Sequence, residues 1–535
     1  MSMTSMIGKA VGLGSVGLGA SAIFRYQQIL QREEQLPSKA HPLLPGVANS
    51  NSSNGKKNAI VIGGGVVGVT AAYKLALAGH SVALLEPRSE PGQECSACAA
   101  GGMQRSNPTV DKDTWMAVLQ SIAPWKSGSG DFKFFHIDWW KTLSDPLFAR
   151  WIFTFTRTSL FPGPEQQDKQ QQMLAFTKYA VEDMVKMMKD PNDNMAVKSG
   201  FNPRGSLNLS YQQPAQTKTV SHPSGSIKRA VEPVQELIND QITEQEPSII
   251  FQTVKPTTAK FQYESCAASS ERFTQELAQR CKDLGVTFLY DTTVKAIQVD
   301  QKDNSTNNNN NNKPRISQLV TNRGVVHVPE NTDVVVAAGA WVPHVLALLD
   351  LYAPVYPLKG YAMSVSAKDA LASNKLLKEQ DLPSRIVSDK YMFTSRLGDE
   401  IRITSIGEFS GWSTVPNQSV EAEVRREAVR QFPQLQSLIE KAPTRCGHRP
   451  YVSDGILLLG RADTHENLLV SCGPGSNGWK LAMGSGEVIQ RLVSGDTEEQ
   501  ISQDLGFDVR TFSPGNGRVS KAPLFAKLCR ARWDL

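Results

Sequence analysis

The sequence predicts an α/β fold of more than one domain, built around a Rossmann-like βαβ unit. Two glycine-rich turns, at residues 63–68 and 473–478, each lie between an apolar run and a helical pattern. Between them, residues 354–365 and 401–406 alternate in the way that half-buried strands do. At 535 residues, the chain can bury a large core and divide into domains.

The first glycine turn lies inside a complete strand, turn, helix and strand pattern. Residues 59–62 form a short apolar run, residues 69–78 have a helical pattern that Gly79 ends, and residues 81–85 form a second apolar run. Glu86 follows that run about 20 residues after the glycines, which is the spacing of a dinucleotide-binding unit. A merely structural turn needs none of this context, so we interpret the unit as a dinucleotide site.

Each glycine of this turn has its own reason to lack a side chain. Gly63 allows the tight turn, Gly65 lets backbone approach a pyrophosphate, and Gly68 lets the helix pack on the strand. The helix N-terminus behind them favours a diphosphate. Glu86 can accept hydrogen bonds from a ribose diol but would repel a 2′-phosphate, which disfavours NADP.

The composition excludes some classes of partner. A net charge of +5 is small for this length, and no dense block of Lys and Arg is present, so we expect no nucleic-acid partner. The seven cysteines are odd in number and scattered, which is not a disulfide framework. Cys95 and Cys98 have the spacing of a redox pair but lack the second pair that a zinc site needs. We therefore expect two small side chains in a tight loop and no metal.

Residues 1–57 precede the first strand and look like an appendage. Lys9 is the only charged residue between Met6 and Phe24, and the first acidic residue is Glu33. This pattern favours a mitochondrial presequence. A weak membrane anchor and a secretory or plastid-type signal remain alternatives, as do cytoplasmic and plasma-membrane locations. Residues 37–57 are rich in Pro, Ser and Asn and are expected to be a flexible linker.

The elements after the βαβ unit can be assigned in order. In residues 87–105, small side chains should let the backbone wrap a ligand closely. Leu147, Trp151 and Phe155 share one helical face, which favours a buried core helix over a helix in peripheral contact with a membrane. The further expected elements are a helix at 166–189, irregular and β-structure at 190–260 covering the substrate, a helix at 270–283, strands at 286–290 and 293–299, an exposed hairpin tip at 307–312 and a buried strand at 332–341.

The second glycine turn identifies the dinucleotide more closely. Residues 467–472 form an apolar run, and Gly473, Gly475 and Gly478 open another helix. NAD alone does not explain a second such turn so far along the chain. FAD explains the second turn, because its isoalloxazine ring extends beyond the first βαβ unit and needs a helix terminus of its own.

From about Ala59 to Gly495, the chain resembles the D-amino-acid oxidase superfamily of flavoproteins, and within it the bacterial FAD-dependent D-amino-acid dehydrogenases. The motifs that carry the resemblance are Ile60-Val-Ile-Gly-Gly-Gly, Glu86-Pro-Arg88, Glu94-Cys-Ser-Ala-Cys-Ala-Ala-Gly-Gly, Val335-Val-Ala-Ala-Gly-Ala-Trp, Pro357-Leu-Lys-Gly-Tyr, Gly447-His-Arg-Pro with Asp454-Gly455, and Gly475-Ser-Asn-Gly-Trp. The first motif is generic, whereas the last three together are fairly specific. Residues 265–269 depart from the usual Gly-Asp of the family.

The resemblance implies an FAD-binding domain of the glutathione-reductase type, interleaved with a substrate domain built on a mixed sheet. The expected FAD-binding domain comprises residues 58–125, 260–350 and 445–500. The expected substrate domain comprises residues 126–259 and 351–444, and residues 501–535 are expected to be a C-terminal tail. No cysteine can be placed at the covalent flavin link of the sarcosine-oxidase branch, so we expect noncovalent FAD.

The resemblance also assigns residues to the cofactor. It implies that the diphosphate lies at Gly63, Gly65, Val66 and Gly68, the ribose at Glu86 and the adenine at the backbone of Val294. The other expected cofactor residues come from the matching motifs and are Arg88, Gly101, Gly102, Ala338, Gly339, Trp341, Gly455, Gly475, Gly478 and Trp479.

The implied activity is oxidation of D-amino acids to 2-oxo acids and ammonia, with a quinone, a carrier protein or oxygen as electron acceptor. Arg449 is expected to bind the substrate carboxylate bidentately, with a structural ion pair as its alternative role. Tyr361 is expected beside it, unless it is a packed sheet tyrosine. Lys480 stands where the sarcosine-oxidase branch has a carboxylate-binding lysine. A neutral amine needs no general base, so no catalytic residue is assigned.

Two other functions remain open at this point. The chain could oxidise glycine, sarcosine or other N-methyl amino acids, as the resemblance of residues 477–481 to the sarcosine-oxidase branch suggests. It could also be a flavin-binding assembly protein without turnover, because intact glycine turns alone do not prove catalysis.

Overall fold

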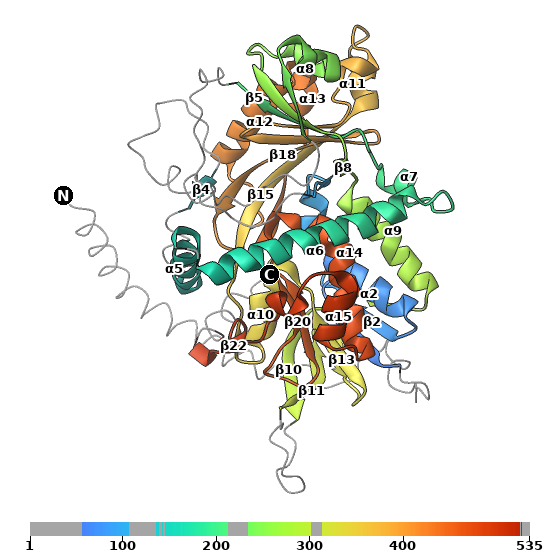
Figure 1. The fold of residues 1–535 in the computed structure, drawn as a ribbon, viewed down its shortest axis with the longest axis vertical. Helices are drawn as coiled ribbons and strands as arrows, with labels where there is room; N and C mark the ends of the chain where they lie inside the picture. The colour runs from blue at the N-terminus through green and yellow to red at the C-terminus, as the bar shows by residue number, and fades with distance from the viewer. Residues whose placement is uncertain are drawn as a thin grey trace, which may run out of the picture.

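The computed structural model describes residues 56–105, 135–138, 142, 145–161, 163–211, 234–300, 313–524 and 526. Within these residues the chain forms two halves along its longest axis (Figure 1). The lower half in this view holds a six-stranded, mostly parallel sheet, and the upper half holds a nine-stranded mixed sheet. Helix α6 (Pro164–Lys189) crosses the molecule between the two sheets.

The six-stranded sheet has the order β20-β21-β13-β1-β2-β9, and only β20 runs antiparallel to its neighbour. Its strands are β1 (Asn58–Ile62), β2 (Ser81–Leu85), β9 (Thr287–Leu289), β13 (Thr332–Val336), β20 (Leu458–Arg461) and β21 (Leu468–Cys472). All five residues of β1 are buried, as expected for a parallel strand that is covered on both faces. The strands predicted at 59–62 and 81–85 are confirmed. The strand predicted at 332–341 ends at Val336 and is followed by a short 3-10 helix, Gly339–Trp341.

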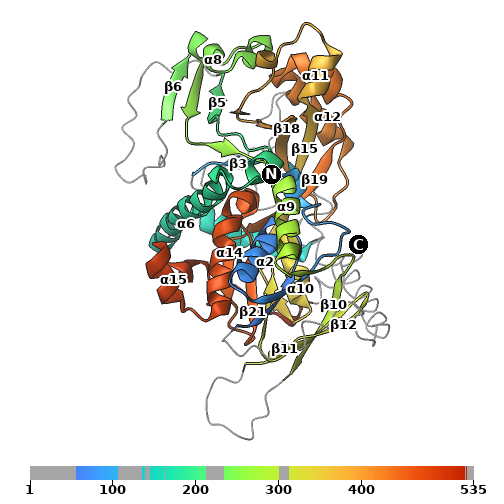
Figure 2. The ribbon, with the colours of Figure 1, turned by 90° about the vertical axis from the view of Figure 1, so that its right-hand side faces the viewer.

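Helices cover one face of this sheet and a small second sheet covers the other. The helices α2 (Val66–Leu77), α9 (Ser270–Asp283) and α14 (Gly478–Ser494) lie side by side in Figure 2. The opposite face packs on the antiparallel strands β10 (Val294–Asp300), β11 (Arg315–Thr321) and β12 (Gly324–His327). Alternation along β1 produces both contacts, because Val61 packs with the helices and Ile60 packs with the small sheet.

The nine-stranded sheet has the order β19-β15-β18-β17-β16-β5-β7-β6, and β4 pairs with β18. Its strands are β4 (Phe135–Ile137), β5 (Ser206–Ser210), β6 (Val234–Ile238), β7 (Thr258–Gln262), β15 (Val355–Ser366), β16 (Ile386–Ser388), β17 (Met392–Leu397), β18 (Glu400–Phe409) and β19 (Arg445–Val452). Its outer face packs on a layer that includes α8 (Asp240–Gln245), α11 (Ala367–Ser373), α12 (Gln418–Gln431) and α13 (Gln436–Ile439). The other face of this sheet is directed toward the lower half of the molecule.

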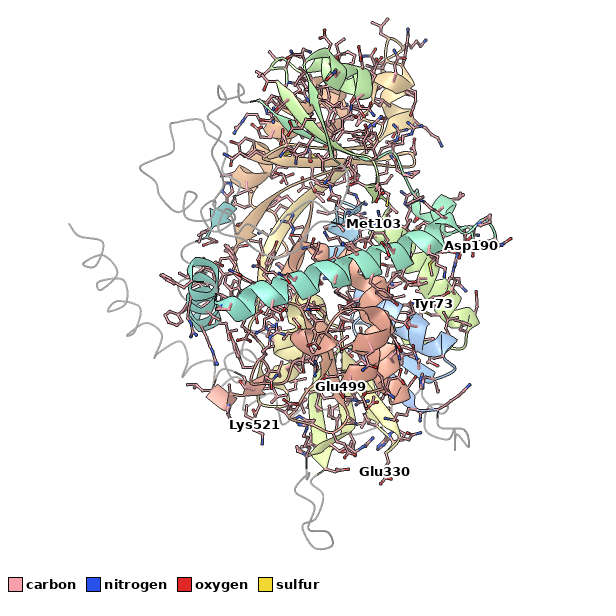
Figure 3. The ribbon with its side chains drawn as sticks, in the orientation of Figure 1. Tyr73, Met103, Asp190, Glu330, Glu499 and Lys521 are labelled. Carbon is pink, nitrogen blue, oxygen red and sulfur yellow. The ribbon has the colours of Figure 1, made fainter. Side chains whose placement is uncertain are left out.

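Short elements complete the described chain. They are α7 (Met195–Ser199), α10 (Val342–Ala347), α15 (Glu498–Leu505), the pair β14 (Leu351–Tyr352) and β22 (Ser520–Lys521), the pair β3 (Gly102–Met103) and β8 (Cys266–Ala267), and seven short 3-10 helices. Figure 3 labels Met103 close to α6, at the level where the two halves meet.

Three of the expected domain boundaries need correction. Residues 445–452 were expected in the FAD-binding domain, but as β19 they pair with β15 in the nine-stranded sheet. Helix α6 was expected in the substrate domain, but its buried face, which includes Phe176 and Ala180, packs on α14. Residues 501–512 are not part of a tail, because Ile501 and Phe512 are fully buried in the same core. In each case the segment packs with the part of the fold that buries its apolar residues, and not with the segments next to it in the sequence.

Helix α5 (Pro146–Leu160) decides between the two interpretations of the aromatic stretch. Leu147, Trp151 and Phe155 are at most 4% exposed and pack against β15, which confirms the buried core helix. Among the described residues, no helix has the length and apolar character needed to span a membrane. The expectations for residues 1–55 and for the hairpin tip at 307–312 lie outside the described residues.

Candidate functional site

A single cavity of about 810 Å³ lies between the two halves of the chain. Residues 63–67 of the first glycine turn and residues 474–480 of the second both line it. The two turns are therefore joined by one continuous groove, as the expectation of a single long dinucleotide requires. The volume lies in the upper part of the range for small-molecule and cofactor sites.

Two glycines of the first turn, Gly63 and Gly68, lie where a side chain would clash with backbone. Gly63 has φ +116°, which other residues rarely adopt. A Cβ on Gly68 would lie 1.9 Å from the carbonyl oxygen of Gly63, so the helix and the strand are in direct backbone contact. Helix α2 begins directly behind the turn and has no acidic residue in its first turn. The positive end of its dipole therefore suits an anion such as a diphosphate.

Glu86 lies at the end of β2, at the other side of this turn. Its carboxylate accepts hydrogen bonds from the backbone N–H of Gly64 at 2.6 Å and of Arg88 at 3.0 Å. Burial raises the pKa of Glu86 to about 7, although both hydrogen bonds act to lower it. Residues 292–294 line the same part of the cavity, so a ribose diol at Glu86 would place a base beside Val294.

The opposite end of the cavity is formed by turns from four separate segments. Ala338 and Gly339 follow β13, Gly475 precedes α14 and Gly478 begins it, and the others come from residues 101–104 and from β19. The indole N–H of Trp479 donates to the carbonyl of Gly101 at 3.0 Å and so fixes one segment to another. This end can hold the flat ring system of a flavin between backbone turns.

The structure brings most of the predicted site residues together. The cavity wall contains Gly63, Gly65, Val66, Glu86, Arg88, Gly101, Gly102, Val294, Ala338, Gly339, Trp341, Arg449, Gly475, Gly478, Trp479 and Lys480. Gly68 lies behind the wall, where it allows helix α2 to approach β1. Gly455 does not line the cavity, because it lies in the turn after β19 with φ +74° and donates its N–H to Val452.

The expectation that Tyr361 lines the pocket beside Arg449 is corrected. Tyr361 is 1% exposed and points to the outer, helix-covered face of the nine-stranded sheet. Its hydroxyl donates to Glu408 at 2.6 Å and accepts from the N–H of Asn417. Residues two apart in a strand share a face, so Tyr361 lies with the core residue Met363 and not with its neighbour Gly360, which does line the cavity.

Arg449 reaches the cavity from the edge strand β19, and Gly360 makes room for it. A Cβ on Gly360 would lie 2.5 Å from one terminal nitrogen of the Arg449 guanidinium and 2.7 Å from its central carbon. The planar guanidinium therefore lies directly against the backbone of β15. Sequence reasoning did not assign this role to Gly360, although a glycine inside a strand pattern signals a close approach.

Lys480 also lines the cavity, and its ammonium group has a backbone partner. The side chain is 5% exposed and donates to the carbonyl oxygen of Gln104 at 3.1 Å. It therefore fixes the segment that follows the small-residue loop. Arg449 and Lys480 both place positive charge in the cavity wall.

Glu94 connects several segments of this wall, and sequence reasoning gave it no role. Its carboxylate accepts from Arg88 at 2.9 Å and from the indole N–H of Trp341 at 3.2 Å, and it lies 3.5 Å from Nδ1 of His448. Burial alone would raise the pKa of Glu94, but His448 and Arg88 outweigh burial and hold it at about 2. Glu94 is therefore ionised at neutral pH.

Cys95 and Cys98 are free thiols in a 3-10 helix of the cavity wall. Burial raises the pKa of Cys95 to about 12 and that of Cys98 to about 11, so both stay protonated at neutral pH. Arg402 braces this helix by donating to the carbonyls of Ala97 and Ala99. No cluster of potential metal ligands occurs in the part of the chain that the structure describes.

The residues present fit FAD. The glycine turn with its helix terminus suits the diphosphate, the carboxylate of Glu86 suits the ribose, and the cavity continues from there to the second glycine turn. A mononucleotide would leave the far end empty. These residues would therefore hold a long dinucleotide.

Comparison with known proteins agrees with this geometry. Residues 58–492 match the family model of DAO, FAD dependent oxidoreductase. A D-amino acid dehydrogenase of Bradyrhizobium diazoefficiens is 25% identical over 448 residues, which cover 82% of this chain and 96% of that protein. A D-amino acid dehydrogenase of Vibrio vulnificus is 23% identical over 456 residues, which cover 84% and 98%.

Solved structures of similar fold include a glycine oxidase and an L-proline dehydrogenase. Glycine oxidase from Bacillus cereus aligns with a TM-score of 0.55 at 18% identity and covers 84% of this chain and 98% of its own. L-proline dehydrogenase from P. horikoshii aligns with a TM-score of 0.55 at 17% identity and covers 86% and 97%. At this identity the likeness shows the shared fold.

Proposed function

Since this chain belongs to the DAO family of FAD-dependent oxidoreductases, we propose that it oxidises D-amino acids to 2-oxo acids and ammonia. The relatives named D-amino acid dehydrogenase support the proposal, because they align over at least 96% of their length. The alignment therefore includes both the cofactor half and the substrate half, and not the dinucleotide site alone.

The observation that carries the proposal is the position of Arg449. Its guanidinium lies in the wall of the cavity that fits FAD, and it reaches this wall from the strand β19 of the substrate half. An amino-acid carboxylate can accept two parallel hydrogen bonds from such a group. The backbone of Gly360 supports the guanidinium from behind, which limits its motion and orients the bound carboxylate.

The side chains of this site would bind and orient the substrate. Arg449 would fix the carboxylate, so that the amine-bearing carbon next to it projects toward the cofactor end of the cavity. Bound FAD would supply the acceptor for two electrons, which is chemistry that no side chain here provides. Water then hydrolyses the resulting imine, so that the products are a 2-oxo acid and ammonia. Orientation is thus the main task of the protein.

The protonation states of the site residues fit a protein that orients the substrate while FAD accepts the electrons. Glu94 stays anionic because its pKa is about 2, and it holds Arg88 and Trp341 in place. The thiols of Cys95 and Cys98 stay protonated, so they are neither bases nor nucleophiles at neutral pH. We propose that the substrate binds with a neutral amine and that no side chain removes its proton.

Anaerobic reduction of the bound flavin tests the proposed function. The purified holoenzyme is mixed with single D-amino acids, their L-enantiomers, glycine and sarcosine, and the loss of the oxidised flavin absorbance is followed. We expect reduction by D-amino acids and little by their enantiomers. Reduction by glycine or sarcosine alone would favour the small-amine oxidase, and a flavin that no amine reduces would contradict catalysis. Release of the flavin on denaturation checks that FAD is bound noncovalently.

A further inference from the structure

His448 forms a buried contact between the two halves of the chain. Its imidazole is fully buried, and it belongs to β19 of the nine-stranded sheet. Its Nδ1 lies 3.5 Å from the carboxylate of Glu94, which precedes the cavity-lining 3-10 helix of the other half. The ring also packs edge-on against Trp341, at 6.0 Å between centroids. One side chain thus contacts two separate segments of the cofactor half.

Both ring nitrogens of His448 face oxygen atoms that can only accept hydrogen bonds. The Nε2 lies 3.3 Å from the carbonyl oxygen of Ser413, and the Nδ1 faces the Glu94 carboxylate. A neutral imidazole has one N–H and would direct a lone pair at one of these oxygens. A doubly protonated ring would direct one N–H at each oxygen and form a charge pair with Glu94.

The other charges near His448 are already paired. Lys359, which is opposite His448 in the β15–β19 register, forms an ion pair with Glu408 at 2.8 Å. Arg88 approaches from the cofactor half and shares the Glu94 carboxylate with His448. The contact between Glu94 and His448 therefore joins the two halves, and the next residue along β19 is Arg449.

We propose that His448 is a positioning residue, which holds β19 against Glu94 and so keeps the Arg449 guanidinium at its place in the cavity. The proposal rests on the proposed function, in which Arg449 anchors the substrate carboxylate. Without the contact, β19 would keep its ladder to β15 and the ion pair between Arg445 and Glu271 at 3.0 Å, but it would lose the contact with Glu94 directly beside Arg449.

Binding of propanoate tests this role, because it carries the carboxylate of an amino acid and lacks the amine. Its dissociation constant is measured from the absorbance change of the flavin in the wild type, His448→Gln, Glu94→Gln and the double variant. We expect each single variant to bind propanoate at least about tenfold more weakly, because a 1 Å misplacement can cost about a hundredfold. The double variant should be no weaker than the singles, since both changes break one contact.

The two single variants also separate positioning from a general charge effect. His448→Gln removes a positive charge and Glu94→Gln removes a negative one. A field effect on the anion would therefore weaken binding in the first variant and tighten it in the second, and that result would overturn the proposal. In turnover, KM should rise more than kcat falls, because a carboxylate anchor acts on ground state and transition state alike.

Controls keep the test independent of folding and of the proposed function. His344→Gln changes another buried histidine beside Trp341, and it should leave propanoate affinity and FAD content unchanged. Nitrogen NMR of histidine-labelled holoenzyme should show N–H signals at both nitrogens of His448, and a neutral tautomer would refute the charge pair. If no carboxylate binds to the wild type, the proposed function fails, whereas the NMR result still decides the state of His448.

Discussion

Replacing Gly360 by alanine tests the role of Arg449 without changing Arg449 itself. Gly360 lies in the strand β15, and its backbone has a conformation that alanine adopts without strain. The new Cβ would lie 2.5 Å from the nearest guanidinium nitrogen of Arg449, well inside van der Waals contact. The end of an arginine side chain can yield where a backbone atom cannot, so we expect the fold to survive and the guanidinium to move.

The size of the effect follows from this overlap. Ordinary contact between such atoms begins near 3.5 Å, so the guanidinium must retreat by about 1 Å. A displacement of about 1 Å at a group that orients a substrate can cost about a hundredfold in rate. This corresponds to about 2.7 kcal/mol of transition-state stabilisation. Arg449→Ala removes the anchor completely and sets the upper limit of the loss.

The assay compares kcat/KM for the best D-amino acid among the wild type, Gly360→Ala and Arg449→Ala. Each preparation is checked for its flavin content, which should not change, because the glycine turns are far from the substitution along the chain. Gly163→Ala is the matched control, since no atom lies within 4 Å of its new Cβ and its φ of −74° suits alanine. Wild-type kinetics in both Gly360→Ala and Arg449→Ala would remove Arg449 from the site.

Three further predictions follow from other parts of the structure. Gly68→Ala should yield protein without flavin absorbance, because its Cβ would meet the backbone oxygen of Gly63 at 1.9 Å, and a fully loaded variant would contradict this. Burial raises the pKa of Glu86 from 4.5 to about 7, so FAD-free protein should lose up to about 3 kcal/mol of stability as pH rises between these values. Thermal unfolding should show this loss in the wild type and not in Glu86→Gln. Tyr361→Phe should keep kcat/KM and lose about 1–3 kcal/mol in denaturant unfolding, because Glu408 loses a donor, and a kinetic defect would return Tyr361 to the site.

The cofactor half could be predicted from sequence because its signals are local. The helix predicted at 270–283 is α9 with the same bounds, since Ser269 accepts a hydrogen bond from the N–H of Arg272 at its start and Gly285 follows its end. The glycine spacing and the acid after the second strand likewise lie within 24 consecutive residues, 63–86. Such patterns can be recognised without knowing which distant segments of the chain are in contact.

The substrate half depends on pairings that the sequence does not state. Arg449 meets Gly360 only because β19 pairs antiparallel with β15, and these strands are far apart in the chain. The face of Tyr361 depends on where the register starts, and a shift by one residue would have turned it into the cavity. His448 and Glu94 are far apart in the sequence, and they meet only because the fold packs the two halves against each other.

The place of β19 at the edge of its sheet explains why so much of the site converges on it. Among the described residues, no strand pairs with its outer edge apart from an isolated bridge between Tyr451 and Pro474. An edge strand presents backbone N–H and C=O groups to whatever lies beside it, and here the cavity and the 3-10 helix of Cys95 and Cys98 lie there. A Cβ on Gly447 would already lie 2.9 Å from that of Cys98, so a larger residue would push the edge away. A bound ligand can thus meet the backbone of β19 and the side chain of Arg449 together, which a central strand could not offer.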